Sequence, residues 1–327
     1  MANDKKSSLL YILKILQEET DDEHLLTYLG IADKLYARFG IELERKTIAS
    51  NIDVLSNQGY DIVKCGKNGL YLGSRDFEDG ELVFLIDAIY SSKSMPTKYA
   101  KDLVCKLTKN FSRFKRKQVN HLEKIDDGSK TDNKQIFYTI EILNDAIEKK
   151  KKVEFQYGAY NTNKEFTLRG DGKVYKINPY FMVNNRGKYY LVCNYEKYSD
   201  IANYKIECIS NIKILDEDVK PIEELCDGKK FSIKEYMKEH IYMVSGKTIE
   251  AKVKIDSEER VNDFVDWFGK DVDFGRKDGN IFAELKVNED ALIYWSLQYG
   301  EHVEILEPAE TRQKIKSALE TMLKKYQ

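Results

Sequence analysis

The sequence is poor in the residues that build cross-linked, metal-bound or membrane-spanning proteins. Its 327 residues include only four histidines, four prolines and five cysteines. The cysteines are scattered and form no C-x-x-C pair, which predicts free thiols in a reducing cytoplasm. No apolar run approaches the roughly 18 residues that a membrane helix needs. The polar residues 1–8 are not typical of a signal peptide. We therefore expect a cytoplasmic protein that has no membrane segment.

An excess of charge of one sign is also missing. The chain has 53 basic and 55 acidic residues, a formal net charge of −2, which argues against a histone-like binder of nucleic acid. A local basic patch is still compatible with this average. Because 42% of the residues are hydrophobic, a chain of this length can form two or three domains with real cores.

Motifs that carry catalysis are absent as well. The sequence has no H-E-x-x-H zinc motif, no glycine-rich phosphate loop and no G-x-S-x-G nucleophile elbow. We therefore predict no catalytic residue, no metal and no cofactor, and a protein that is not an enzyme. Catalytic groups that meet only in the folded chain would escape such a search.

Residues 1–75 contain three helical patterns followed by two short strands. Ser7 or Ser8 is expected to cap the first helix, and Thr27 to open a second one that stops at Gly40. A third helix is expected to begin near Glu44 and to end before residue 59. Residues 60–64 and 69–72 then predict a small wing joined by residues 65–68. Three helices and a wing are typical of a winged helix-turn-helix.

The third helix has a buried and an outward side. If Ile48, Ile52 and Leu55 face inward, steps of 100° per residue point Lys46 and Ser50 outward. Recognition helices contact DNA with their N-terminal half. The predicted DNA-binding residues of the helix and wing are Arg45, Lys46, Thr47, Ser50, Asn51, Lys64 and Lys67.

An ordinary solvated helix face is the alternative to a DNA-binding surface. Residues 1–70 carry nine basic and eleven acidic residues. Asp53 also points outward, where it would lie beside phosphate. The pattern alone leaves both interpretations open.

Residues 76–150 are predicted to be helical and hold the strongest local charge. Between residues 93 and 117 there are nine basic residues and one acid, Asp102. Leu103, Leu107, Phe111 and Phe114 predict a buried stripe along one helix whose other sides are basic. Such a helix can bind the phosphate backbone by releasing counterions, or it can be a solvated cationic face. Residues 126–133 predict a loop, and residues 134–149 a further helix.

Residues 151–327 divide into two patterns. Alternating apolar residues from 151 to 217, with a tight turn at 185–187 and a strand over 204–209, predict a small β-barrel. Residues 218–247 are expected to be a linker. Residues 248–327 predict the order β-α-β-β-α-β followed by one terminal helix, which is ferredoxin-like. The whole chain is therefore expected to be an α+β multidomain protein.

Short motifs in a fixed order connect these segments to a known family. They are N-P-Y at 178–180, G-K-Y-Y-L at 187–191 and Y-K-I-E-C-I at 204–209, preceded by R-K-T-I at 45–48, G-Y-D-I at 59–62, R-D-F at 75–77 and E-L at 81–82. In their order and spacing they resemble the bacterial WYL-domain transcriptional regulators over almost the whole chain. The Trp-Tyr-Leu of that family stands here as Tyr189, Tyr190 and Leu191.

The resemblance implies a domain for each segment. It implies a winged helix-turn-helix over 1–75, a helical linker and dimerisation region over 76–150, and a WYL domain of the Sm-like barrel type over 151–217. A linker over 218–247 and a ferredoxin-like WYL C-terminal extension over 248–327 follow.

The resemblance also implies a ligand pocket in the WYL domain. Carried over by position, its ligand-binding candidates are Tyr157, Tyr180, Tyr190, Tyr204, Lys205 and Glu207. Three arginines of the family's strand stand here as Ala202, Lys205 and Cys208. One lysine cannot reproduce the two-donor fork of arginine, so the expectation of an anionic ligand is weakened. The alternative is that the tyrosines are core residues or cross-strand pairs.

Two functions follow from these patterns. The preferred hypothesis is a homodimeric regulator that binds double-stranded DNA at an inverted-repeat operator and is modulated by a small-molecule or nucleic-acid ligand at the WYL domain. The alternative is an accessory module, associated with defence or repair, that binds single-stranded nucleic acid or a protein and does not control transcription.

Overall fold

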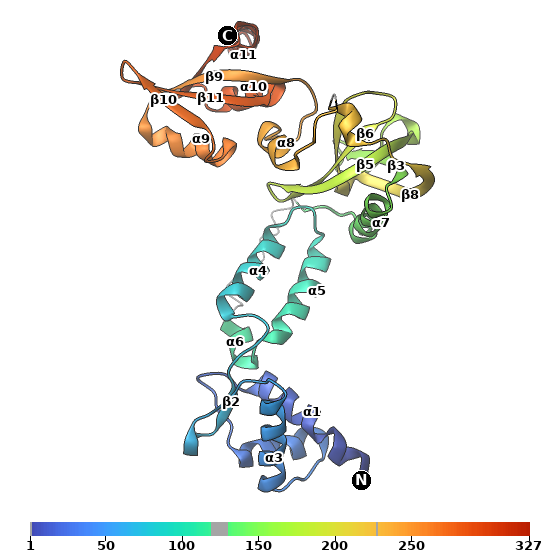
Figure 1. The fold of residues 1–327 in the computed structure, drawn as a ribbon, viewed down its shortest axis with the longest axis vertical. Helices are drawn as coiled ribbons and strands as arrows, with labels where there is room; N and C mark the ends of the chain where they lie inside the picture. Colours follow the sequence, from blue (N-terminus) through green and yellow to red (C-terminus); the bar gives the residue numbers. More distant parts are fainter. Residues whose placement is uncertain (1, 119–129, 227) are drawn as a thin grey trace. The chain divides into compact units, whose positions relative to one another are not determined.

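The fold consists of helices and antiparallel sheets in two compact units. The computed structural model (Figure 1) describes residues 2–118, 130–226 and 228–327. The N-terminal unit comprises residues 1–132 and the C-terminal unit residues 133–327. Within the predicted loop of 126–133, residues 126–129 lie outside the described part of the chain.

Three helices and a two-stranded hairpin begin the N-terminal unit. They are α1 (Ala2–Glu19), α2 (Tyr28–Phe39), α3 (Arg45–Asn57), β1 (Ile62–Lys64) and β2 (Leu70–Leu72). The hydroxyl of Thr27 accepts a hydrogen bond from the Gly30 amide, and Gly40 ends α2 in the left-handed conformation, so both predicted boundaries are confirmed. The predicted cap at Ser7 or Ser8 is wrong, because α1 starts before them and Ser8 is buried inside the helix bundle.

Two longer helices and a short one complete this unit. They are α4 (Asp79–Ser91), α5 (Thr97–Leu107) and α6 (Arg113–Gln118), and α4 and α5 lie side by side (Figure 1). The predicted single basic helix over 93–117 is therefore wrong. Pro96 precedes α5, and Phe111 adopts an extended backbone (φ −87°, ψ 155°) between α5 and α6. The extended conformation lets the Phe111 ring pack with Leu82 and Ile86 of α4.

Side chains from α6 and the residue before it dock on the loop that follows α1. The Ser112 hydroxyl donates to Asp21 at 2.5 Å, and the Phe114 ring stacks on His24 with centroids 3.6 Å apart. Lys115 forms an ion pair with Asp22 at 3.0 Å. Burial alone would raise the pKa of Asp21, but hydrogen bonds from Ser112 and His24 outweigh it and hold this pKa below its usual value. We call this cluster the Asp21 joint.

One helix and six strands begin the C-terminal unit. They are α7 (Ile136–Glu148), β3 (Lys151–Tyr160), β4 (Phe166–Leu168), β5 (Val174–Asn185), β6 (Lys188–Tyr195), β7 (Ile201–Lys205) and β8 (Ile209–Asp218). The strand order is β4-β3-β5-β6-β7, and β8 returns to pair with β3. Sequence analysis grouped α7 with the helical segment before it. In the structure Ile136, Leu143 and Ala146 are buried in the core of these strands.

The backbone between β6 and β8 confirms one prediction and corrects another. Positive φ angles at Arg186 (52°) and Gly187 (77°) form the expected tight turn between β5 and β6. The predicted strand over 204–209 is wrong, because a 3-10 turn, η5 (Ile206–Cys208), interrupts it. Residues three apart face opposite sides of a strand but the same side of a 3-10 helix. The turn thus allows both Ile206 and Ile209 to be fully buried in one core.

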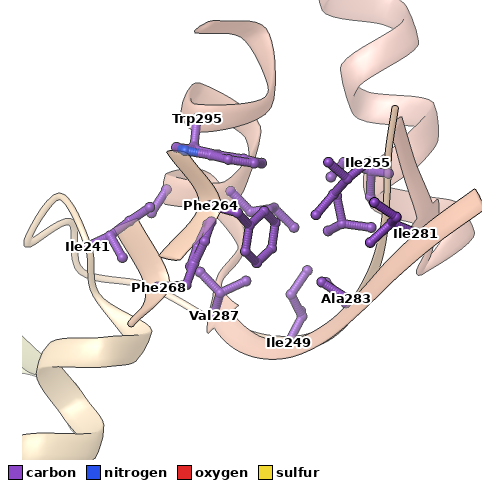
Figure 2. Close-up of a cluster of buried hydrophobic side chains, with 14 residues drawn as sticks. Ile241, Ile249, Ile255, Phe264, Phe268, Ile281, Ala283, Val287 and Trp295 are labelled. Atoms are coloured by element: carbon purple, nitrogen blue, oxygen red, sulfur yellow. The ribbon is translucent and has the colours of Figure 1, made fainter. Parts of the chain in front are cut away.

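A second sheet with helices ends the chain, in the predicted order of elements. After η6 (Ile222–Leu225) and α8 (Ile233–Glu239) come β9 (Thr248–Ile255), α9 (Val261–Phe268), β10 (Asp273–Lys277), β11 (Asn280–Asn288), α10 (Glu289–Gln298), β12 (Val303–Glu307) and α11 (Ala309–Leu323). The antiparallel order is β10-β11-β9-β12. Figure 2 shows Phe264 and Phe268 of α9 and Trp295 of α10 packed over the apolar residues of β9 and β11.

Candidate nucleic-acid interface

The outward face of α3 presents side-chain donors that no other described residue uses. Lys46, Thr47 and Ser50 are exposed, and none of their side chains makes a hydrogen bond or ion pair with any described residue. On the opposite side, Ile48 and Ile52 are fully buried, which fixes the rotation of the helix. The arrangement agrees with the predicted helical periodicity.

The N-terminal end of α3 is open and carries the exposed cation Arg45 beside the exposed acid Glu44. Its N-cap residue, Glu44, makes no side-chain capping bond, so the first amides of the helix remain open to an acceptor. Arg45 is exposed, and its guanidinium lies 5.6 Å from the centre of the Tyr28 ring of α2. Backbone amides and a cation at a helix start are suited to a phosphate group.

Asn51 does not belong to this outward set. Its amide nitrogen donates to the hydroxyl of Ser8 in α1 at 3.2 Å, and the residue is half-buried. The bond joins α3 to α1. The sequence pattern could not show this contact, because Ser8 is 43 residues away in the chain.

The two wing lysines differ in their surroundings. Lys67, in the turn η1 (Gly66–Asn68), is exposed and has no partner among the described residues. Lys64 at the end of β1 donates to Asp53 of α3 at 2.7 Å. The hydrogen bond and charge of Asp53 raise the pKa of Lys64. Lys67 is thus free to contact phosphate, whereas Lys64 already neutralises an acid of the same surface.

The basic stretch of 93–117 splits into a free and a paired part. Five exposed lysines form no ion pair with any described residue: Lys93, Lys98, Lys101, Lys106 and Lys109. Farther along, Arg113 pairs with Glu19 at 3.1 Å and Lys115 with Asp22. The paired cations Arg113 and Lys115 hold α6 in place, so the five lysines of the first part are the candidates for a basic patch among the described residues.

The six proposed pocket residues do not gather at one place. Tyr157 and Tyr204 lie within the core packed on strands β3 to β8, with ring centroids 4.9 Å apart, and the Tyr157 hydroxyl accepts a hydrogen bond from the Lys205 amide at 3.2 Å. Tyr180 is 8% exposed and donates to the Lys220 carbonyl at 2.8 Å. Burial raises the pKa values of all three of these tyrosines.

Tyr190, Lys205 and Glu207 form a separate group. Tyr190 of β6 and Lys205 of β7 are directly opposite each other in the sheet. Tyr190 packs in a cluster with Val192 and Tyr236, away from the barrel core. The carboxylate of Glu207, 8% exposed, pairs with Lys188 at 2.8 Å. Burial alone would lower the pKa of Lys188, but its bond to Glu207 outweighs burial and raises this pKa.

The comparisons with known proteins concern mainly the C-terminal unit. The WYL domain family matches residues 138–214, and the WCX domain family matches residues 247–323. This chain contains a WYL domain and a WCX domain. Comparison with curated proteins gave no match.

Two solved structures are similar to this WYL-domain protein. Proteasome accessory factor B/C (PafBC) of Arthrobacter aurescens is 13% identical with a TM-score of 0.30, over 98% of this chain and 49% of that chain. A CRISPR Cas-related protein is 15% identical with a TM-score of 0.38, over 99% of this chain and 85% of that chain. The chain thus spans about half the length of the first structure.

Two cations of the WYL domain lie over its aromatic rings, and sequence analysis missed both. The guanidinium of Arg169 is 5.4 Å from the centre of the Tyr157 ring. The ammonium of Lys173 is 5.0 Å from the Tyr175 ring and 5.3 Å from the Tyr195 ring. Both cations are exposed and flank the turn η4 (Gly170–Gly172), whose G-D-G sequence was the available signal of a sharp turn. We call these residues the cation–aromatic cluster.

Cavities of the WYL-domain protein lie away from the proposed pocket residues. One of about 590 Å³ is lined by the start of β7, by α8 and by the start of β9, and another of about 1220 Å³ lies between α10, β12 and α11. Neither includes any of the six pocket candidates. In the described residues no three His, Cys, Asp or Glu side chains are grouped to hold a metal, and no helix combines the length and apolarity of a membrane span.

Proposed function

We propose that this WYL-domain protein is a DNA-binding transcriptional regulator. In this proposal residues 1–75 form a winged helix-turn-helix, the 151–217 strands an Sm-like barrel and the 248–327 elements a ferredoxin-like domain. Its role is binding and not catalysis. The single observation that carries the proposal is the outward face of α3, where Lys46, Thr47 and Ser50 are exposed and unpaired.

The chemistry of this face suits duplex DNA. Lysine and serine donate to base edges in the major groove, and the N-terminal amides of α3 and Lys67 can bind phosphates on either side. Burial of Ile48 and Ile52 keeps the donors in fixed directions. A rigid row of donors on one helix is what direct readout of a sequence requires.

The proposal includes a homodimer and an inverted-repeat operator. Two copies of α3 related by a two-fold axis would contact half-sites about 34–36 Å apart. The helical segment of α4 and α5 is the proposed dimerisation region. Exposed Phe84 of α4 (73%) is an apolar group available for such contacts.

Ligand modulation is proposed for the group of Tyr190, Lys205 and Glu207. A ligand would act by binding two dimer arrangements with different affinities and so changing the spacing of the α3 helices. Glu207 is paired with Lys188, and Lys205 forms no ion pair with any described residue, so Lys205 is the cation that the group offers to a ligand. A ligand held there would carry few negative charges. Titration of nucleoside monophosphates into the full chain and into its Lys205→Ala variant, followed by tyrosine fluorescence, tests the proposed ligand site.

Titration on duplex DNA tests the regulator itself. The full chain is titrated on duplex from its own upstream region and on a scrambled duplex of the same composition, at two salt concentrations. We expect tighter binding to the natural duplex at both, with affinity falling as salt rises. Equal affinity for the two duplexes would contradict specific binding to an operator and would indicate nonspecific electrostatic attraction alone.

A second candidate function is favoured by the cation–aromatic cluster. Partly exposed rings with cations above them are suited to stacking the bases of single-stranded nucleic acid, without transcriptional control. Competition distinguishes the two functions. If single strands displace duplex from the full chain and Lys173→Ala abolishes only single-strand binding, the barrel is a nucleic-acid site of its own. If single strands do not compete, this candidate fails.

A further inference from the structure

Asp53 is an acid on the side of α3 that we propose for DNA, about one turn beyond Ser50. It follows Ser50 by three residues and Lys46 by seven on α3, so the three side chains share one side of the helix. Its side chain is 61% exposed. A carboxylate at this place repels phosphates, and a surface that only needed to attract DNA would gain affinity by losing it. The acid therefore needs an explanation that goes beyond attraction.

The pairing of Asp53 gives that explanation. Lys64 of β1 donates to Oδ1 of Asp53 at 2.7 Å, while Oδ2 makes no hydrogen bond to any described residue. An ammonium group has three donors, so Lys64 keeps two for a phosphate. The pair removes the net charge, connects the wing to α3 and leaves one carboxylate oxygen pointing to solvent as an acceptor.

We infer that Asp53 is a base-reading residue that selects cytosine, with Lys64 as its positioning residue. This inference rests on the proposed function. In the major groove cytosine presents the N4 amino donor, which a carboxylate accepts, whereas guanine and thymine present acceptors at the equivalent edge. Adenine also presents an amino donor, N6, but the N7 acceptor beside it repels a carboxylate. Lys64 would hold Asp53 in place and contact a phosphate at the same time, because phosphate contacts position a protein on the duplex and base contacts specify the sequence.

Selection from randomised duplexes tests the inference with the full chain and three variants. We expect the unmodified chain to prefer cytosine at one position of each half-site. Asp53→Asn should change this preference to adenine, because the asparagine amide pairs with adenine N6 and N7. Asp53→Ala should remove the preference, a loss of discrimination on the order of tenfold at that position alone. Lys64→Gln should keep cytosine but weaken the discrimination and flatten the salt dependence of binding.

A matched control separates base reading from a simple change of charge. Asp278, in the turn between β10 and β11, is exposed and forms no ion pair with any described residue, so Asp278→Asn removes the same charge from the C-terminal unit, away from α3 and from the proposed dimerisation region. This control should leave every base preference unchanged. If the unmodified chain selects a sequence that Asp53→Ala leaves unchanged at every position, the inference is overturned and the regulator stands. If the unmodified chain selects no sequence, both are overturned.

Discussion

The α3 face and the proposed ligand pocket of the WYL domain were both predicted from residue types, but their side chains differ in exposure and in their partners. On α3, Lys46 and Ser50 are exposed and have no partner among the described residues. In the barrel, Tyr157, Tyr180 and Glu207 are buried, and each has a partner within the C-terminal unit. Polar groups that the fold already satisfies stabilise it, whereas polar groups left open on a rigid element are available to a ligand.

A substitution on the buried side of α3 should have the largest effect on the free energy of unfolding. Ile52 is fully buried in the core of the N-terminal unit. Its replacement by alanine should lower the free energy of unfolding by about 2–5 kcal/mol, since it removes buried methylene groups and leaves a cavity. Urea denaturation followed by circular dichroism measures the loss. A value below about 1 kcal/mol would mean that this side of the helix is not the packed one.

Breaking the ion pair between Glu207 and Lys188 should have the second-largest effect on the free energy of unfolding. Lys188→Met leaves the carboxylate of Glu207, 8% exposed, without its cation, and Lys188 itself is 29% exposed. We expect a loss of about 2 kcal/mol, less than for a fully buried pair because solvent screens the lysine. Lys213→Met, at a 73% exposed site, is the control and should change little.

The same pair should show a defined dependence on pH. The pKa of Lys188 is raised above its ordinary value of 10.5. Its contribution is therefore complete below the pKa of the unfolded chain and is lost as pH rises through the folded pKa. The difference in unfolding free energy between the unmodified chain and Lys188→Met should be constant from pH 7 to 9 and shrink in more alkaline buffer. A difference that grows with pH would contradict the pairing.

Removal of the Tyr157 hydroxyl should have a smaller effect. This hydroxyl accepts the Lys205 amide at 3.2 Å. In Tyr157→Phe the amide loses its acceptor, which should cost about 1 kcal/mol of unfolding free energy. If the hydroxyl were instead reserved for a ligand, the phenylalanine variant would be as stable as the unmodified chain, and the contrast between the two regions would fail.

The outward side of α3 should show the smallest effect on stability. Lys46→Ala and Ser50→Ala should each change the unfolding free energy by less than about 0.5 kcal/mol. The same substitutions should weaken specific DNA binding by about 1–3 kcal/mol for each lost base contact. Fluorescence anisotropy on the upstream duplex gives the second quantity. Loss of stability without loss of affinity would reverse the roles assigned to the two regions.

The predictions that held depend on local periodicity. Thr27, Gly40 and the buried side of α3 follow from spacing within one helix, and the turn at Arg186 and Gly187 follows from its own residues. The order of elements in residues 248–327 was also evident from alternating patterns. Such features need only the chain within a few residues of each position.

The predictions that failed depend on distant parts of the chain. Phe111 interrupts the basic helix because it packs on α4, and Asn51 turns inward because Ser8 lies opposite it. Glu207 is paired through a lysine that stands 19 residues earlier. Residue types and spacing can predict that a polar group belongs to a site, but the fold determines which partner that group has. The exposure of Lys46, Thr47 and Ser50 therefore followed from the sequence, whereas the partners of the WYL-domain candidates did not; binding of DNA or of a ligand at these residues stays a prediction.

The Asp21 joint connects α6 to the loop after α1 within the N-terminal unit. Ser112, Phe114 and Lys115 each hold a different residue of the loop after α1. With three unlike contacts at one place, α6 and the loop after α1 should move as one body. A displacement of α6 would then be transmitted to α1 and to the α3 face proposed for DNA, and removal of these contacts should make the two parts move independently.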